Sequence, residues 1–156
     1  MNFLGAVSTA IKGIISIVLL VVTILGGLLF IDAQTFHAES SEASVTPGTG
    51  EYVITIPINI SYNGILFEAN FITINTSILR GDTNETIDSY SETFSLGKSG
   101  THLYTAELHV PEDIMTQFAD GTLDLYVKVS VKLWMCLFGY RIFPISSTST
   151  SPMQPT

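Results

Sequence analysis

The sequence predicts an all-β sandwich of about six to seven antiparallel strands, preceded by one transmembrane helix. Apolar and polar residues alternate with a period of two over most of residues 51–145, as they do in strands that bury one face. Residues 13–31 (GIISIVLLVVTILGGLLFI) instead form a run of 19 residues without a charge. Because a single sheet cannot bury its own apolar face, the strands are expected to form two sheets packed face to face.

The composition narrows the possible classes of function. A chain of 156 residues accommodates one ordinary domain with accessory segments. Its 14 acidic and 6 basic residues give a net charge of −8, so we expect no nucleic-acid partner. Cys136 is the only cysteine, which excludes an intrachain disulfide, and no Cys/His cluster indicates zinc. We expect no cofactor.

The uncharged run 13–31 is long enough to cross a bilayer as a helix. At 1.5 Å per residue it would extend about 28 Å, close to the roughly 30 Å of a hydrocarbon core. Lys12 precedes the run and all 14 acids follow it, which places the N-terminus in the cytoplasm. The sequence therefore predicts a single-pass plasma-membrane protein with an extracellular C-terminal domain and the lipid bilayer as a partner.

Two other interpretations of this segment stay open. Ala33 could precede the cut of a signal peptide, although the apolar run is longer than the usual secretory core. Lys12-Gly13 followed by an apolar helix resembles the leaders of type IV pilins and archaeal flagellins. That resemblance implies clipping at Gly13 and bundling of the helices into a filament core. The glutamate that many bacterial pilins carry early in this helix is absent.

Low-complexity segments flank the predicted domain. Residues 34–50 are rich in Ser, Thr, Gly and Glu without an apolar period, so we expect a stalk. Residues 146–156 (SSTSTSPMQPT) are expected to form a flexible tail. The predicted organisation is therefore a helix with a short cytoplasmic lead at 1–33, the stalk, a sandwich at 51–145, and the tail.

The alternation predicts the strands of the sandwich in order. Pro57 places the first strand at an edge or a bulge. Residues 111–118 predict a short helix, with acids at its positive end. The expected strands are 52–60, 65–79, 86–95, 102–110, 123–133 and 140–145. The alternation is strongest in 123–133, and a turn near Phe138-Gly139 follows it.

Residues 52–145 resemble the group 2 late embryogenesis abundant family, an immunoglobulin- or fibronectin III-like sandwich that also occurs in archaeal membrane-anchored proteins. The resemblance is carried by Ile56–Ile60 with the turn Tyr62-Asn63-Gly64, the long second strand, the loop Gly97–Gly100, and the strand 123–133 with its closing partner 140–145. The Asn-Pro-Asn turn common in plant members is replaced by Asn63-Gly64. The resemblance implies a binding or structural module without catalytic residues.

No arrangement of reactive side chains predicts catalysis. His37 lies in the stalk, and His102 and His109, seven positions apart on one strand, point to opposite faces. Cys136 lies among apolar residues and is expected to be a small buried hydrophobe. The acids at 82–88 lack the glycine and final glutamate of an EF-hand. We expect no catalytic, cofactor or metal site and infer no small-molecule substrate.

Two surface features remain as candidates for interaction. Asn59, Asn75 and Asn84 begin Asn-X-Ser/Thr sequons, and all three are candidate glycosylation sites. The outward side of 126–138 carries aromatic residues beside Lys128 and Lys132. This pattern favours a central strand, with a patch that contacts a membrane or a partner as the alternative.

The sequence thus predicts a non-enzymatic, membrane-anchored cell-surface module with a structural or interaction role. Its expected protein partners are an envelope protein or further copies of itself. The alternative is a pilin-like subunit whose N-terminal helix lies in the core of an extracellular filament.

Overall fold

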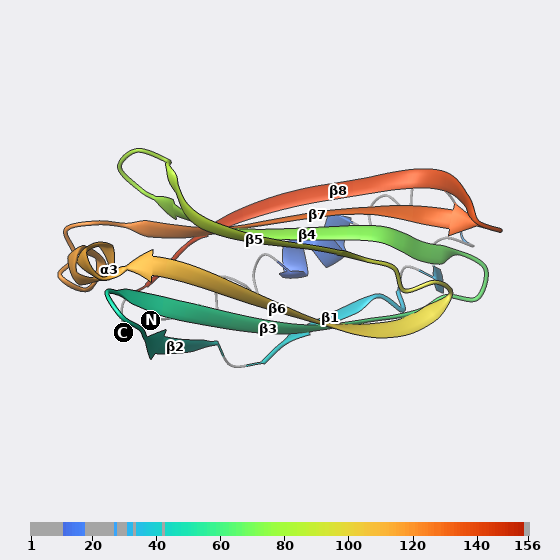
Figure 1. Ribbon diagram of the computed structural model, residues 1–156. Helices are drawn as coiled ribbons and strands as arrows, with labels where there is room; N and C mark the ends of the chain where they lie inside the picture. The colour runs from blue at the N-terminus through green and yellow to red at the C-terminus, as the bar shows by residue number, and fades with distance from the viewer. Residues whose placement is uncertain (1–10, 18–26, 28–30, 33, 42, 155–156) are drawn as a thin grey trace.

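The computed structural model describes residues 11–17, 27, 31–32, 34–41 and 43–154. Two antiparallel sheets pack face to face, and the helix α3 (Glu112–Ala119) lies at one end of the sandwich (Figure 1). The strands are β1 (His37–Ser40), β2 (Ser44–Pro47), β3 (Glu51–Asn63), β4 (Glu68–Arg80), β5 (Thr86–Phe94), β6 (Ser99–Pro111), β7 (Leu125–Leu137) and β8 (Tyr140–Pro152).

The first sheet, sheet A, is built around β3. One side of β3 pairs with β6 over its full length, from Glu51 opposite Pro111 to Asn63 opposite Ser99. The other side of β3 pairs with the short strands β1 and β2, one after the other. The second sheet, sheet B, has the order β5-β4-β7-β8. The all-β sandwich is therefore confirmed, with eight strands in the described part of the chain instead of six or seven.

The core follows from the alternation along the strands. Ile54, Ile56, Ile58 and Ile60 of β3 are all at most 2% exposed, and the inward residues of β7 are buried opposite them. The turn predicted at Phe138-Gly139 joins β7 to β8. Both of its residues have positive φ, as in the tight turns that match strand twist.

The two segments expected outside the sandwich belong to it. Residues 34–50, predicted as a stalk, contribute β1 and β2, which are held by backbone pairing with β3. Residues 146–152, predicted as part of a flexible tail, continue β8 along β7. Ser147 and Ser151 are buried there while their neighbours are exposed. Backbone hydrogen bonds between strands do not require apolar side chains. The polar composition of these segments therefore does not indicate that they form strands.

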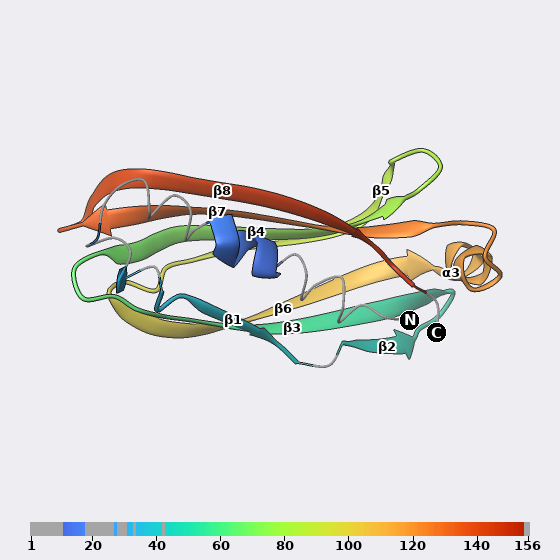
Figure 2. The same cartoon turned by 180° about the vertical axis from the view of Figure 1, so that it is seen from behind.

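The predicted transmembrane helix needs correction. Within the described residues, every helix is too short or too polar to cross a bilayer. Residues 18–26 and 28–30 of the uncharged run lie outside the described part of the chain. Residues 11–17 are helical and lie between the sheets, where Ile11 and Ile14 are buried in the core (Figure 2). The predicted plasma-membrane location, signal anchor and pilin-like subunit all required an apolar helix that lies outside the folded domain. These predictions are therefore corrected together with the transmembrane helix.

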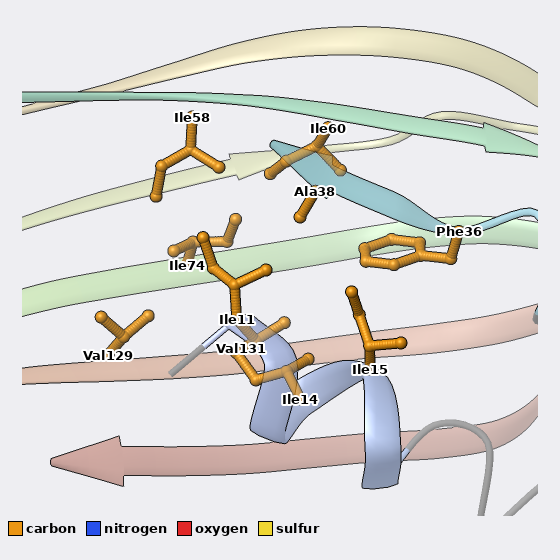
Figure 3. A pocket seen from close by; sticks show the side chains of 10 residues that line it. All are labelled: Ile11, Ile14, Ile15, Phe36, Ala38, Ile58, Ile60, Ile74, Val129 and Val131. Atoms are coloured by element: carbon orange, nitrogen blue, oxygen red, sulfur yellow. The ribbon is translucent and has the colours of Figure 1, made fainter. Parts of the chain in front are cut away.

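The physical reason is that the sandwich itself supplies an apolar environment for this helix. The helix packs against β1 and β3 on one side and β4 and β7 on the other, and leaves a cavity of about 20 Å³ (Figure 3). The cavity is lined only by apolar side chains, which are Ile11, Ile14, Ile15, Phe36, Ala38, Ile58, Ile60, Ile74, Val129 and Val131. A void of this size with no polar partner stays dry. The helix therefore completes the core at this edge.

A buried carboxylate ties the N-terminal segment to the turn between β3 and β4. Asp32 is 1% exposed, and its Oδ1 accepts the backbone N–H of Ile65 at 2.7 Å. Its Oδ2 accepts the N–H groups of Leu66 at 2.9 Å and Phe67 at 2.7 Å. Burial and the nearby Asp32 carboxylate raise the pKa of Tyr62, whose hydroxyl donates to the Phe67 carbonyl. We call this arrangement the Asp32 clasp. It satisfies three donors of the turn.

The opposite edge of the sandwich is closed by polar side chains that join β6 to sheet B. The hydroxyls of Thr76 and Tyr104 are hydrogen-bonded at 2.7 Å, and the Tyr104 hydroxyl donates to the Tyr90 carbonyl at 3.3 Å. Burial raises the pKa of Tyr104 to about 12. His102 and Glu92 pair at 2.9 Å along the same edge.

Docking of the N-terminal helix is tested by replacing its buried isoleucine. Ile14→Ala should lower the free energy of unfolding by about 2 to 4 kcal/mol, because it removes a buried side chain from the core. The matched control is Ile17→Ala, where the side chain is 37% exposed and the expected loss is below about 0.5 kcal/mol. Urea unfolding of both variants gives the comparison. Equal losses would contradict the docked position.

The Asp32 clasp is tested by an isosteric change. Asp32→Asn should destabilise the fold by about 3 kcal/mol, because an amide N–H₂ then faces buried N–H donors that lose an anionic acceptor. Asp124→Asn changes an exposed acid in the same way and should alter stability by less than about 0.5 kcal/mol. Thermal unfolding followed by circular dichroism measures both. A small effect of Asp32→Asn would show that the clasp contributes little.

Candidate functional site

The outer face of sheet B is polar over all four of its strands. Cross-strand register places twelve outward side chains in three rows, and every one of them is Ser, Thr, Asn or Lys. We call this surface the hydroxyl face. Its rows are Thr93-Thr73-Lys132-Ser146, Ser91-Asn75-Ser130-Thr148 and Ser89-Ser77-Lys128-Thr150. In a chain with 14 acidic residues, none falls within these rows.

Hydrogen bonds between neighbouring side chains order the hydroxyl face. The hydroxyls of Thr73 and Thr93 lie 2.9 Å apart across β4 and β5, and those of Ser130 and Thr148 lie 3.1 Å apart across β7 and β8. The Ser77 hydroxyl donates to Oδ1 of Asn75 at 2.9 Å. Cross-strand pairs of this kind stabilise a sheet. They also hold the polar groups in defined directions, so the surface is preorganised for a ligand.

The middle of the hydroxyl face is hollowed into a groove of about 350 Å³. Its lining comes from β4, β5 and β7, and consists of Thr73, Asn75, Ser77, Ser91, Lys128, Ser130 and Lys132. Each hydroxyl can both donate and accept a hydrogen bond, and the lysines can only donate. The groove therefore offers many hydrogen-bonding groups and two positive charges.

A larger hollow of about 700 Å³ lies beside the Asp32 clasp and is open to solvent. Its lining includes His37, Tyr62 and Asn63 but no carboxylate, Lys or Arg. Its lining also includes Ile31 and Gln34, which are next in sequence to residues outside the described part of the chain. The groove on sheet B, bounded entirely by described strands, is the better-defined site.

The two lysines make the groove locally positive in an acidic protein. Both are exposed, and no salt bridge involving Lys128 or Lys132 is found within the described part of the chain. The acids of β5 turn away from the hydroxyl face. Asp88 accepts the backbone N–H of His109, and Glu92 pairs with His102. The ammonium groups are therefore available to an anionic ligand.

An aromatic shelf continues the groove toward the β7–β8 turn. We define it as Phe71, Trp134 and Arg141. The guanidinium carbon of Arg141 lies 4.1 Å from the centre of the Phe71 ring and 5.5 Å from that of Trp134, which is a cation–π arrangement. Trp134 is the next outward position on β7 after Lys132, so the shelf and the groove share one surface.

Phe71 reaches this position through an unusual backbone conformation. It lies at a register shift between Asn70 and Thr73 and has a φ of 53°, while its side chain is 43% exposed. The left-handed region is unfavourable for a bulky residue and is associated with functional sites. The Phe71 N–H donates to the Ser95 hydroxyl at 3.0 Å, which helps to hold the conformation.

The three predicted glycosylation sites lie in different places. Asn59 is exposed on the outer face of sheet A, and Asn84 is exposed in the β4–β5 turn with a φ of 58°. Asn75 is half-buried in the groove. Glycosylation of these residues stays a prediction. The structure does not bring the three together.

Several members of the candidate site were not predicted from the sequence. Lys128, Lys132 and Trp134 were recognised as outward residues of one strand. The contributions of β4, β5 and β8 were not predicted. Residues 146–151 are all Ser or Thr, so they show no alternation of apolar and polar residues that would indicate a strand. Nothing in the sequence marks the bulge that exposes Phe71.

His102, His109 and Cys136 serve the fold. His102 stacks on Phe94 with ring centres 4.0 Å apart, and His109 pairs with Glu51 at 2.9 Å. Cys136 is buried as expected, and burial raises the pKa of its thiol. Among the described residues, no three His, Cys, Asp or Glu side chains form a group that could hold a metal ion.

Comparisons with known proteins concern the fold alone. No protein-family model matches the sequence, and no match is found among curated proteins. A Bordetella pertussis structure called ApaA has a TM-score of 0.46 and 13% identity, covering 78% of this chain and 97% of that one. A β-glucuronidase from Bacteroides uniformis has a TM-score of 0.45 and 9% identity over 76% of this chain. A glycoside hydrolase family 2 member from Bacteroides cellulosilyticus has a TM-score of 0.43 and 12% identity over 73% of it.

This chain spans only 13% of the β-glucuronidase and 15% of the family 2 member. The TM-scores are below 0.5, so these similarities assign neither a family nor an activity.

The pairing of His109 with Glu51 makes a testable electrostatic prediction. The hydrogen bond to Glu51 raises the pKa of His109 above its ordinary 6.5. The pair therefore stabilises the fold below that value, and its contribution is lost as the pH rises through the raised pKa. A proton NMR titration of the ring should show a midpoint above 6.5, and Glu51→Gln should lower it. Glu107→Gln, which removes a more distant charge, should lower it less; equal shifts would contradict the pairing.

Proposed function

We propose that this chain is a non-enzymatic interaction module that binds carbohydrate on the hydroxyl face of sheet B. The observation that carries the proposal is the grid of nine hydroxyls, one amide and two ammonium groups around a groove, with an aromatic shelf at its end. A carbohydrate presents hydroxyls that donate and accept hydrogen bonds, which the Ser, Thr and Asn side chains match. Its ring also has apolar faces that can pack on exposed aromatic side chains.

The rigidity of the surface supports binding. The groove is lined by three adjacent strands, and several of its side chains are already hydrogen-bonded to neighbours on the hydroxyl face: Thr73 to Thr93, Ser77 to Asn75, and Ser130 to Thr148. Side chains held in place before a ligand arrives lose little conformational freedom on binding. A groove that is open to solvent and continues onto the aromatic shelf also suits a linear polymer better than a small compact molecule.

The lining of the groove supports binding without hydrolysis. Most glycoside hydrolases use a pair of carboxyl groups on either side of the bond that breaks. The groove contains no Asp or Glu, and the nearby acids of β5 are paired along the closed edge of the sandwich. We therefore propose recognition of a polysaccharide without turnover.

The proposal predicts that blocking the groove abolishes polysaccharide binding. Ser130→Trp places a large ring in the centre of the groove and should weaken binding at least about tenfold, because several hydrogen bonds of about 1 kcal/mol each are lost. Thr105→Trp, at a half-buried position of β6 in sheet A, is the matched control and should leave binding unchanged. Affinity electrophoresis against cellulose derivatives, dextran, chitosan, polygalacturonate and hyaluronate provides the measurement.

Circular dichroism and thermal unfolding show whether both variants remain folded. Failure of the unaltered chain to bind any of these polymers would refute the proposed function. Equal weakening by Ser130→Trp and Thr105→Trp would show that the groove is not the binding surface.

A further inference from the structure

The charges on the hydroxyl face point to a narrower class of ligand. Lys128 and Lys132 are both exposed and lie in the groove, on either side of Ser130. Together with Arg141 of the shelf, they are three of the six basic residues in a chain of net charge −8. Because the protein as a whole repels anions, only a local cluster of positive charge can attract one.

Resting on the proposed carbohydrate-binding function, we infer that the ligand is an acidic polysaccharide with widely spaced carboxylates. Lys128 and Lys132 bind its carboxylates, and its chain runs along β7 onto the aromatic shelf. Lysine ammonium groups bind carboxylates as mobile point charges and need no fixed approach geometry. This suits a polymer whose charged groups vary in orientation.

The spacing of the lysines indicates that the charges of the ligand are sparse. Four residues of a strand span about 13 Å, and this is the distance along β7 from Lys128 to Lys132. The row between them, which contains Asn75, Ser130 and Thr148, offers only uncharged hydrogen-bonding groups. A ligand that matches this pattern alternates charged groups with neutral hydroxyls. Single-stranded nucleic acid carries a phosphate on every nucleotide and would place unpaired charges over the middle row.

The aromatic shelf defines one end of the site. Trp134 follows Lys132 on the outward side of β7, so Lys128, Lys132 and Trp134 lie in a line of about 20 Å. Arg141 lies over the rings of Trp134 and Phe71 and so belongs to the shelf. Glu68 lies beside this end and accepts the Asn70 amide at 2.9 Å. The charge of Glu68 offsets that of Arg141 at this end, so the shelf has no surplus positive charge for a carboxylate and binds the apolar face of a sugar ring.

The inference is tested with polymers that differ only in charge. The probes are polygalacturonate and its methyl ester, and hyaluronate and its carboxyl-reduced form. In low salt, the full chain should bind hyaluronate, which carries a carboxylate on alternate sugars, about tenfold more tightly than its carboxyl-reduced form. Polygalacturonate carries a carboxylate on every sugar, so its preference over the methyl ester should be smaller. Lys128→Gln with Lys132→Gln should remove that preference, and added salt should weaken it, because the lysines supply the attraction. Lys98→Gln, which removes a lysine outside the hydroxyl face, should keep it.

Four outcomes would overturn the inference without refuting the proposed function. They are equal binding of acidic and neutral forms, a preference that survives the double lysine substitution, binding to neutral polysaccharides alone, and tighter binding to dextran sulfate or single-stranded DNA than to the carboxylated polymers. Binding to neutral polysaccharides alone would leave the proposed carbohydrate-binding function standing. Binding to no polysaccharide at all would refute both.

A separate measurement tests whether the polysaccharide runs along β7 onto the aromatic shelf. Trp134→Ala should weaken binding of the acidic and neutral forms by the same factor of about ten, because ring packing does not depend on the charge of the ligand. Tyr140→Ala removes a ring that is 74% exposed at the β7–β8 turn but is not part of the shelf, and should have no effect. Unchanged binding by folded Trp134→Ala would overturn the shelf as the end of the site.

Discussion

Sheet B can bury only one of its two faces, and both the core and the candidate binding surface follow from that constraint. Side chains alternate across a strand, so each apolar residue turned inward fixes a neighbour turned outward. Ile74 and Val131 face the interior, and Asn75 and Lys132 consequently face solvent. A slip of one residue in the register would exchange the two sets. The hydrophobic core therefore determines which polar side chains line up in rows.

The same need to bury apolar surface explains the N-terminal segment. β1 and β2 are short, so sheet A leaves an edge at which residues 11–17 pack against both sheets. The Asp32 clasp adds a polar attachment a short distance along the chain, where a carboxylate satisfies three backbone donors of the β3–β4 turn. Apolar burial and a buried anion thus act together to make this segment part of the domain.

The candidate site was predicted only in part. Its central strand was visible, because Lys128, Lys132 and Trp134 alternate with buried residues in the most regular pattern of the chain. The neighbouring strands of the site could not be predicted, because register between strands is decided by tertiary pairing. In addition, the Ser/Thr run of β8 is typical of a flexible tail. Phe71 joins the shelf only because a bulge turns it outward.

The sequence by itself determined the strands between residues 52 and 145, their inward faces and the all-β class, because alternation is a local property that survives in any packed sheet. Only the tertiary structure decided where the apolar residues at 11–17 are buried. Hydropathy measures how unfavourable it is to expose a residue to water. The interior of a sandwich removes apolar residues from water just as a lipid bilayer does. The tertiary structure also decided which polar residues meet, because alignment of four strands separated in sequence depends on how they pair across the whole sheet.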